Sequence, residues 1–135
     1  MDAERTAPPG MARLQARDSV DAAFARLERA VVQRGLTVFA RVNFAADAAA
    51  AGLAMPPTRL LLFGNPRAGT PVMVAAPTAA LDLPLKVLIW EAADGSVWVG
   101  YNTPVYLSER HNVPAELLAN LRAVESLAAI AAGTA

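Results

Sequence analysis

The pattern of hydrophobic positions indicates one long helix near each end of the chain. Between residues 18 and 34 apolar residues recur at helical spacing, with Asp18 or Ser19 as the N-cap and Gly35 as a left-handed stop. A second stretch with helical spacing runs from Pro114 to about residue 131. Three shorter helices are predicted, at 45–53, 65–76 and 104–109.

Runs of β-branched, aromatic and aliphatic residues predict strands at 11–16, 36–44, 58–63, 83–92 and 96–102. Strict alternation along 36–44 would turn one set of side chains to the core, namely Leu36, Val38, Ala40, Val42 and Phe44. Asp94-Gly95 is a hairpin signal between the last two strands. A loop of two or four residues would place Lys86 and Tyr101 on one face, whereas a bulged three-residue loop would not.

These elements predict one domain rather than two. No repeat or shift in composition divides the 135 residues, and each helix needs a sheet to cover its apolar stripe. We therefore expect a two-layer α+β domain over residues 11–135. Residues 1–10, which include Pro8, Pro9 and Gly10 and show no periodic pattern, are predicted to form a disordered tail.

Composition excludes several kinds of chemistry. Twelve basic and twelve acidic residues balance, so no overall field attracts nucleic acid or an anionic membrane. Without cysteine there is no thiol catalysis and no thiolate metal site, and the lone histidine, His111, is expected to be an exposed bystander in a loop. No metal or cofactor is predicted. The absence of a signal-like segment or a long apolar run predicts a cytoplasmic protein.

The sharpest local feature is the segment FGNPRAGTP at 63–71, where a buried strand meets a helix. Asn65 is the expected N-cap and Pro66 the first helical residue. Unpaired amides at such a helix start can hold a carboxylate, phosphate or sulfate, with Arg67 adding charge and Thr70 a hydroxyl. The alternative is a capped turn that binds nothing.

Two titratable residues near the fourth strand are further candidates. Asp82 is expected to accept hydrogen bonds from backbone amides, and the alternative role is that of a general base. Lys86, the only lysine, lies within an apolar strand and either reaches the sheet edge or ends in a pocket. Tyr101 is expected at the rim of the core.

Several motifs together resemble the domain-of-unknown-function family 302. In order and spacing they match over residues 18 to about 111, and they are Phe39-Ala40-Arg41, Leu61 to Pro66, Gly69-Thr70-Pro71, Leu81 to Leu85 and Tyr101-Asn102. The resemblance implies a curved, largely antiparallel sheet with helices packed on it, and a homodimer. It also implies a ligand pocket that involves Asn43, Asn65, Thr70, Asp82, Lys86 and Tyr101. It implies no activity.

One departure from the family bears on function. Where the family usually shows an aspartate–histidine pair, this chain has Asn43-Phe44. An amide and a phenyl ring cannot replace a carboxylate and an imidazole in proton transfer or metal ligation. The sequence therefore favours a binding module for a small anionic metabolite over a small acid–base enzyme that uses Asp82 and Lys86. A purely structural or protein-interaction domain is the third hypothesis.

Overall fold

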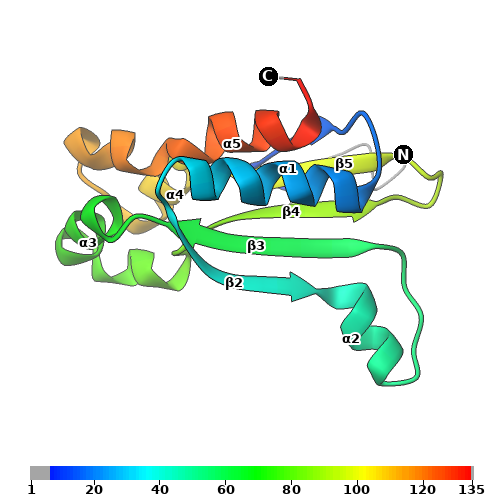
Figure 1. Cartoon of the computed structure of the whole chain (residues 1–135). Coiled ribbons are helices and arrows are strands. Elements are labelled where there is room, and N and C mark those ends of the chain that lie inside the picture. The colour runs from blue at the N-terminus through cyan, green and yellow to red at the C-terminus, as the bar shows by residue number, and fades with distance from the viewer. Residues whose placement is uncertain (1–6, 135) are drawn as a thin grey trace.

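The protein is an α+β domain built on one sheet (Figure 1). Its structure, a computed structural model, describes residues 7–134. All neighbouring strands of the five-stranded sheet are antiparallel, in the order β1-β5-β4-β3-β2. The strands are β1 (Met11–Gln15), β2 (Thr37–Asn43), β3 (Thr58–Gly64), β4 (Leu85–Glu91) and β5 (Val97–Asn102).

The two longest predicted helices lie side by side on one face of the sheet (Figure 1). These are α1 (Val20–Gln33) and α5 (Ala123–Ala132), and each contacts the other and β4. Short helices gather at the end of the sheet where β3 stops, namely α3 (Pro66–Ala75), α4 (Pro104–His111) and the 3-10 helices η2 (Pro77–Leu81) and η3 (Ala115–Leu121). The expected two-layer α+β arrangement with a mostly antiparallel sheet is therefore confirmed.

The core lies between the sheet and the α1–α5 layer. Its largest fully buried side chains include Leu61 and Phe63 from β3, Leu27 from α1 and Leu127 from α5. Burying each such side chain contributes roughly 1.5–3 kcal/mol. Because alternate residues of the strands face this layer, the opposite face of the sheet carries the other half of each strand's side chains.

The predicted facing of β2 is correct only up to its middle. Val38 pairs with a core position of β3 and packs against the core, but a β-bulge between Val38 and Ala40 inserts one residue. Beyond the bulge the alternation is inverted. Arg41 therefore faces the helical layer, where its Nε lies 3.1 Å from a carboxylate oxygen of Glu28 in α1, and Ala40 and Val42 face the other side.

The hairpin between β4 and β5 also differs from the arrangement that would bring Lys86 and Tyr101 together. Its loop has three residues, 93–95, and is closed by the Ala92 N–H donating to the Ser96 carbonyl. Gly95 has a positive φ of 86°, as a bulged loop requires. The resulting register places Lys86 and Tyr101 on opposite faces of the sheet.

Three other elements refine the sequence-based expectations. The predicted helix from residue 114 onward is divided into η3 and α5, and the 3-10 geometry of η3 aligns Leu118 with the buried Leu121 three residues later. Phe44, expected in the core, instead begins helix α2 (Phe44–Ala50) and is exposed. Residues 1–6 of the expected tail lie outside the described residues, whereas Pro8 accepts from Met11 N–H and Gly10 accepts from Thr103 N–H.

Candidate functional site

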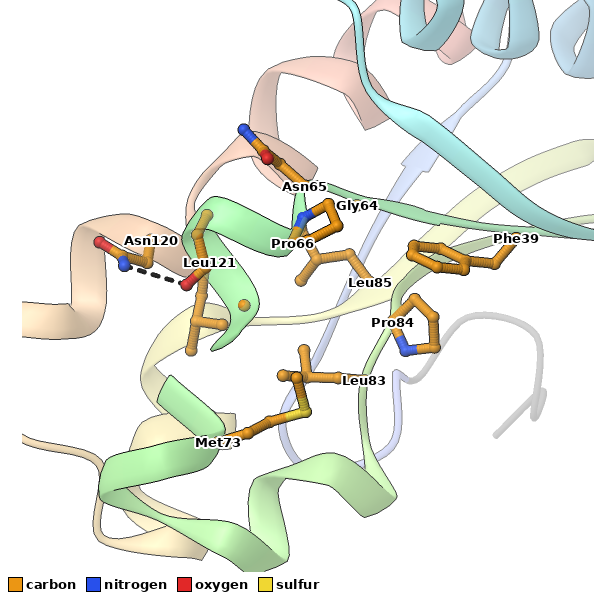
Figure 2. Close-up of a pocket in the computed structure, with 12 residues that line it drawn as sticks. Phe39, Gly64, Asn65, Pro66, Met73, Leu83, Pro84, Leu85, Asn120 and Leu121 are labelled. Atoms are coloured by element: carbon orange, nitrogen blue, oxygen red, sulfur yellow. Dashed lines mark hydrogen bonds between the residues drawn. The ribbon is translucent and has the colours of Figure 1, made fainter. Parts of the chain in front are cut away.

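A cavity of about 190 Å³ opens at the end of the sheet beside α3 (Figure 2). It lies between the edge strand β2, the start of α3, the segment leading into β4, and η3. Its lining is mainly apolar and includes Phe39, Pro66, Met73, Leu83, Leu85 and Leu121. Two amides, Asn65 and Asn120, are its polar members. We call this cavity the α3 pocket.

Local sequence explains the wall that α3 contributes. Asn65 is the N-cap, as predicted, and its side-chain Oδ1 accepts from the Arg67 N–H at 3.0 Å. The N–H groups of Ala68 and Gly69 both point to the Asn65 carbonyl at 2.9 Å, and Pro66 has no N–H. The expectation of unpaired amides at this helix start is therefore wrong, because the cap and the first turn use them internally.

Asn120 joins the pocket to a second helix. Its Nδ2 donates to the Ala68 carbonyl at 3.0 Å, the dashed line in Figure 2, and so fixes η3 against α3. In Figure 2 the Asn120 side-chain oxygen points away from the other lining residues, so this amide holds the wall of the pocket together. Gly69 completes this wall, and a Cβ placed on it would lie 3.9 Å from Met73 Cε, an ordinary contact.

Lys86 follows directly after the pocket-lining residues 83–85. Its Nζ donates to the carbonyls of Asp82 and Pro84, each at 2.9 Å. Half-burial lowers the pKa of Lys86 because it penalises the ammonium, and the negative charge of Asp82 partly opposes this effect. The ammonium thus holds the turn into β4, and the side chain is not part of the pocket lining.

Asp82 occupies a side-chain network rather than the expected backbone-amide site. One of its carboxylate oxygens, Oδ2, accepts from Arg110 Nη1 at 2.7 Å and from His111 Nε2. The other ring nitrogen of His111, Nδ1, lies 2.9 Å from the Thr78 hydroxyl. Burial works to raise the pKa of Asp82, but the bonds and charges of His111 and Arg110 outweigh it, so the pKa lies below its ordinary value.

The histidine expected to be an exposed bystander is therefore nearly enclosed. Only 5% of its side chain is exposed, against 16% for Asp82 and 45% for Arg110. The reason is that residues 104–111 form a complete helix, α4, which carries His111 in its last turn and places it against η2. A single histidine in a polar tripeptide gave no periodic signal for this burial.

The remaining predicted site residues are dispersed. Asn43 caps α2 through a bond from Ala46 N–H, and it lies four residues along β2 from the pocket-lining Phe39, roughly 13 Å away at strand rise. Tyr101 lies on β5 under α5, where burial and the Glu125 carboxylate raise its pKa. Arg67 and Thr70 are exposed on α3. Of the seven candidates, Asn65 alone lines the α3 pocket.

Sequence reasoning missed most of the pocket lining, and the reason is chemical. Leu83, Leu85 and Leu121 read as ordinary core residues, since nothing in a sequence separates a leucine beside a cavity from one in a filled core. Phe39 offered one signal in the sequence, because it belongs to the family-like motif although strict alternation leaves it out of the predicted core set. In the structure it is 52% exposed. Among residues 7–134 no group of three or more His, Asp or Glu side chains is placed to hold a metal ion.

The fold and the pocket define a single-sheet α+β domain with one helical layer and a small apolar cavity at the end of the sheet. A family model described as "Domain of unknown function DUF302" matches residues 12–129. The chain therefore belongs to the DUF302 family, as the motifs indicate. The crystal structure described as uncharacterized conserved protein DUF302 from Bacillus stearothermophilus is similar, with a TM-score of 0.75 over 94% of this chain and 98% of that chain. At 19% identity this likeness shows a shared fold alone.

Two relatives with functional names match this chain over only part of their own length. The relative named "Fluoride-specific ion channel FluC 1" from Brucella suis biovar 1 is 40% identical over 104 residues, which are 77% of this chain and 41% of that protein. The same name in Brucella abortus biovar 1 has the same identity, over 38% of its length. The chain thus spans about two fifths of these relatives. Within residues 7–134, every helix is too short or too polar to cross a membrane.

Proposed function

We propose that this domain binds a small organic molecule with an apolar body in the α3 pocket. The observation that carries the proposal is the cavity itself, about 190 Å³ in volume and lined by leucine, proline, methionine and phenylalanine side chains. Ligand sites are typically concave and mostly apolar, with a few polar groups that fix orientation. Asn65 and Asn120 are the polar residues of this lining, and the cavity is small enough to favour a ligand of one ring or a short branched chain.

The end group of this ligand is proposed to be a carboxylate. The backbone amides of α3 are engaged, so a negative charge must be met by a side chain. Arg67 is exposed and lies between Pro66 and Ala68, which both line the cavity. An arginine binds a carboxylate through two parallel charge-assisted hydrogen bonds. The prediction of an anionic ligand is thus still supported by Arg67, but it is no longer supported by free amides at the helix start.

The test uses benzoate, its uncharged counterpart benzamide, and sulfate as three probes in thermal-shift titrations at constant ionic strength. A ligand that binds only the folded state raises the melting temperature by mass action. Gly69→Leu should fill the pocket, and Thr70→Leu, one residue along and outside the lining, is the matched control. We expect benzoate to stabilise wild type and Thr70→Leu but not Gly69→Leu.

The outcomes separate the two parts of the proposal. Equal stabilisation by benzamide and benzoate would show that the carboxylate is not recognised, but it would support binding in the pocket. If Gly69→Leu responds to benzoate as the wild type does, or if neither aromatic probe stabilises the wild type, the α3 pocket is not the binding site. Stabilisation by sulfate, without any by benzoate or benzamide, would mean that anions bind to the surface charge of α3 and not in the pocket.

We also propose that the domain is a homodimer formed through the open face of its sheet. The residues on this face alternate with the buried positions of β2 to β5 and point away from α1 and α5. Most are apolar and only half-buried, and they include Val42, Leu60, Leu62, Leu88, Trp90 and Trp98. A contiguous apolar sheet face of this kind supports a protein interface, which typically buries about 800 Å² per partner.

Sedimentation equilibrium at micromolar concentration tests the dimer. Leu88→Glu places a charge in the centre of the open face and should yield the monomer mass. Val74→Glu is the control, because Val74 is 77% exposed on α3 and lies outside the sheet. A wild-type protein that sediments as a monomer would contradict the proposal.

A second candidate function rests on the named relatives. We propose that the domain can serve as the accessory part of a fluoride channel, since it matches a 104-residue portion of proteins that carry that name. Fluoride efflux from vesicles would be measured for the Brucella suis protein with and without the matched portion, and after addition of this chain to the shortened protein. Identical efflux in all three preparations would reject this role.

A further inference from the structure

A second group of polar side chains lies behind the α3 pocket and has no part in ligand binding there. Thr78 in η2, His111 at the end of α4 and Asp82 just after η2 form a continuous chain of hydrogen bonds. Arg110 contacts the same Asp82 oxygen, Oδ2, at 2.7 Å. Two segments about thirty positions apart in the sequence meet at this point, because α4 packs against η2.

The carboxylate determines which ring nitrogen of His111 carries the proton. An ionised Asp82 can only accept, so Nε2 must donate to it. In the neutral imidazole, Nδ1 is then the acceptor, and the Thr78 hydroxyl at 2.9 Å donates its proton toward it. A hydroxyl bonded to an imidazole that a carboxylate orients is the arrangement by which enzymes activate a weak oxygen nucleophile.

The three hydrogen-bonded residues Thr78, His111 and Asp82 differ in exposure, and a purely structural contact between η2 and α4 does not require this difference. The imidazole is enclosed, with 5% of its side chain exposed, whereas Thr78 is exposed. The void beside Asp82 and His111 is too narrow for a water molecule. A reactant can therefore approach the Thr78 hydroxyl from solvent, whereas the His111 imidazole bonded to it is shielded from solvent.

We propose that Thr78 is a nucleophile that His111 activates and that it accepts acyl groups from small esters. The Thr78 oxygen would attack the ester carbonyl carbon while its proton moves to His111 Nδ1. The bond from the carbonyl carbon to the alcohol oxygen then breaks, and the proton on Nδ1 passes to the departing alcohol. Water, deprotonated by His111, cleaves the acyl-threonine ester and restores the hydroxyl, so no oxidant or further reactant is required.

The surroundings limit the acyl group to a short apolar one. In a 3-10 helix residues three apart lie on the same face, which places Leu81 next to Thr78. Leu81 is 74% exposed, so the surface beside the hydroxyl is apolar and shallow. Such a surface suits an acetyl or butyryl group and does not enclose a long chain.

The experiment incubates the intact chain with p-nitrophenyl acetate and maps acetylated residues by peptide mass spectrometry. We expect acetyl on the peptide that carries Thr78, no acetyl there in Thr78→Val, and at least wild-type labelling in Thr78→Ser, which keeps the hydroxyl with less crowding. Thr70, exposed on α3 and without a histidine partner among the described residues, is the internal control. Thr78 should be acetylated at least ten times faster than Thr70.

A second variant distinguishes activation from mere accessibility. His111→Asn should abolish Thr78 acetylation, whereas Thr70 should be labelled as in the wild type. If His111→Asn fails to fold, as far-ultraviolet circular dichroism would show, the Thr78→Ser and Thr70 comparison still decides the question. Equal acetylation of Thr78 and Thr70, or acetylation confined to other residues, would overturn the proposal.

Discussion

Removal of the Asp82 carboxylate tests its hydrogen-bond network with His111 and Arg110. The expected loss of unfolding free energy can be worked out from the structure. In Asp82→Ala the His111 Nε2–H loses its acceptor in a side chain that is 5% exposed, which costs about 1–3 kcal/mol. Arg110 is 45% exposed, so loss of its ion pair adds at most about 1 kcal/mol. We therefore expect the free energy of unfolding at pH 7 to fall by about 2–3 kcal/mol.

The pH dependence of this loss has a definite sign. The folded-state pKa of Asp82 lies below the ordinary value of 3.8, so its stabilisation is complete above that pH and disappears as pH falls through the folded-state pKa. Urea unfolding of wild type and Asp82→Ala at pH 7 and at pH 3 measures this directly. The difference between the two proteins should be smaller at pH 3.

Asp47→Ala is the matched control, because Asp47 is an exposed carboxylate in the first turn of α2. It should cost no more than about 1 kcal/mol, the value of a charge at a helix start. A loss below about 0.5 kcal/mol for Asp82→Ala at pH 7 would refute the reasoning. So would a loss that is the same at both pH values, since it would not depend on ionisation of Asp82.

Three further substitutions have expected outcomes that urea unfolding can measure. Gly69→Ala should raise the free energy of unfolding by about 0.5–1 kcal/mol, because the helix gains propensity and the new methyl only touches Met73; a loss would show that the methyl does not fit. Asn65→Ala should lower it by about 1 kcal/mol through loss of the cap, and an unchanged value would mean that water replaces the side chain. Gly10→Ala should lower it by roughly 2–3 kcal/mol, since φ is +81° and the methyl would lie 2.2 Å from the Tyr106 ring; a neutral result would mean that the ring can move aside.

The elements that were predicted correctly are those determined by neighbours in the sequence. Ser19 caps α1 through a bond from Ala22 N–H, and Asn65 with Pro66 opens α3, because a cap acts within three residues. Gly35 has the positive φ expected of a helix stop. For such features the sequence contains the whole interaction, so a pattern of a few residues is sufficient.

The features that were not predicted depend on residues that are distant along the chain. The bulge after Val38 exists because β2 must fit β3, and β2 itself carries no glycine or proline that marks it. The enclosure of His111 depends on η2, at residues 77–81, where the sequence pattern predicts no helix. The α3 pocket likewise requires η3 to meet α3, a contact between segments about fifty residues apart.

The two proposed sites share a wall, which determines the variants that can distinguish them. Leu83 and Leu121 border both the α3 pocket and the narrow void beside the Asp82–His111 pair, so a change in either leucine would disturb both sites at once. Gly69 borders the pocket but not the void, and Thr78 lines neither. If the sites are independent, Gly69→Leu should abolish benzoate binding and leave Thr78 acetylation unchanged, and Thr78→Val should do the reverse. Loss of both properties in either variant would mean that the wall transmits a displacement, so that pocket and network form a single site.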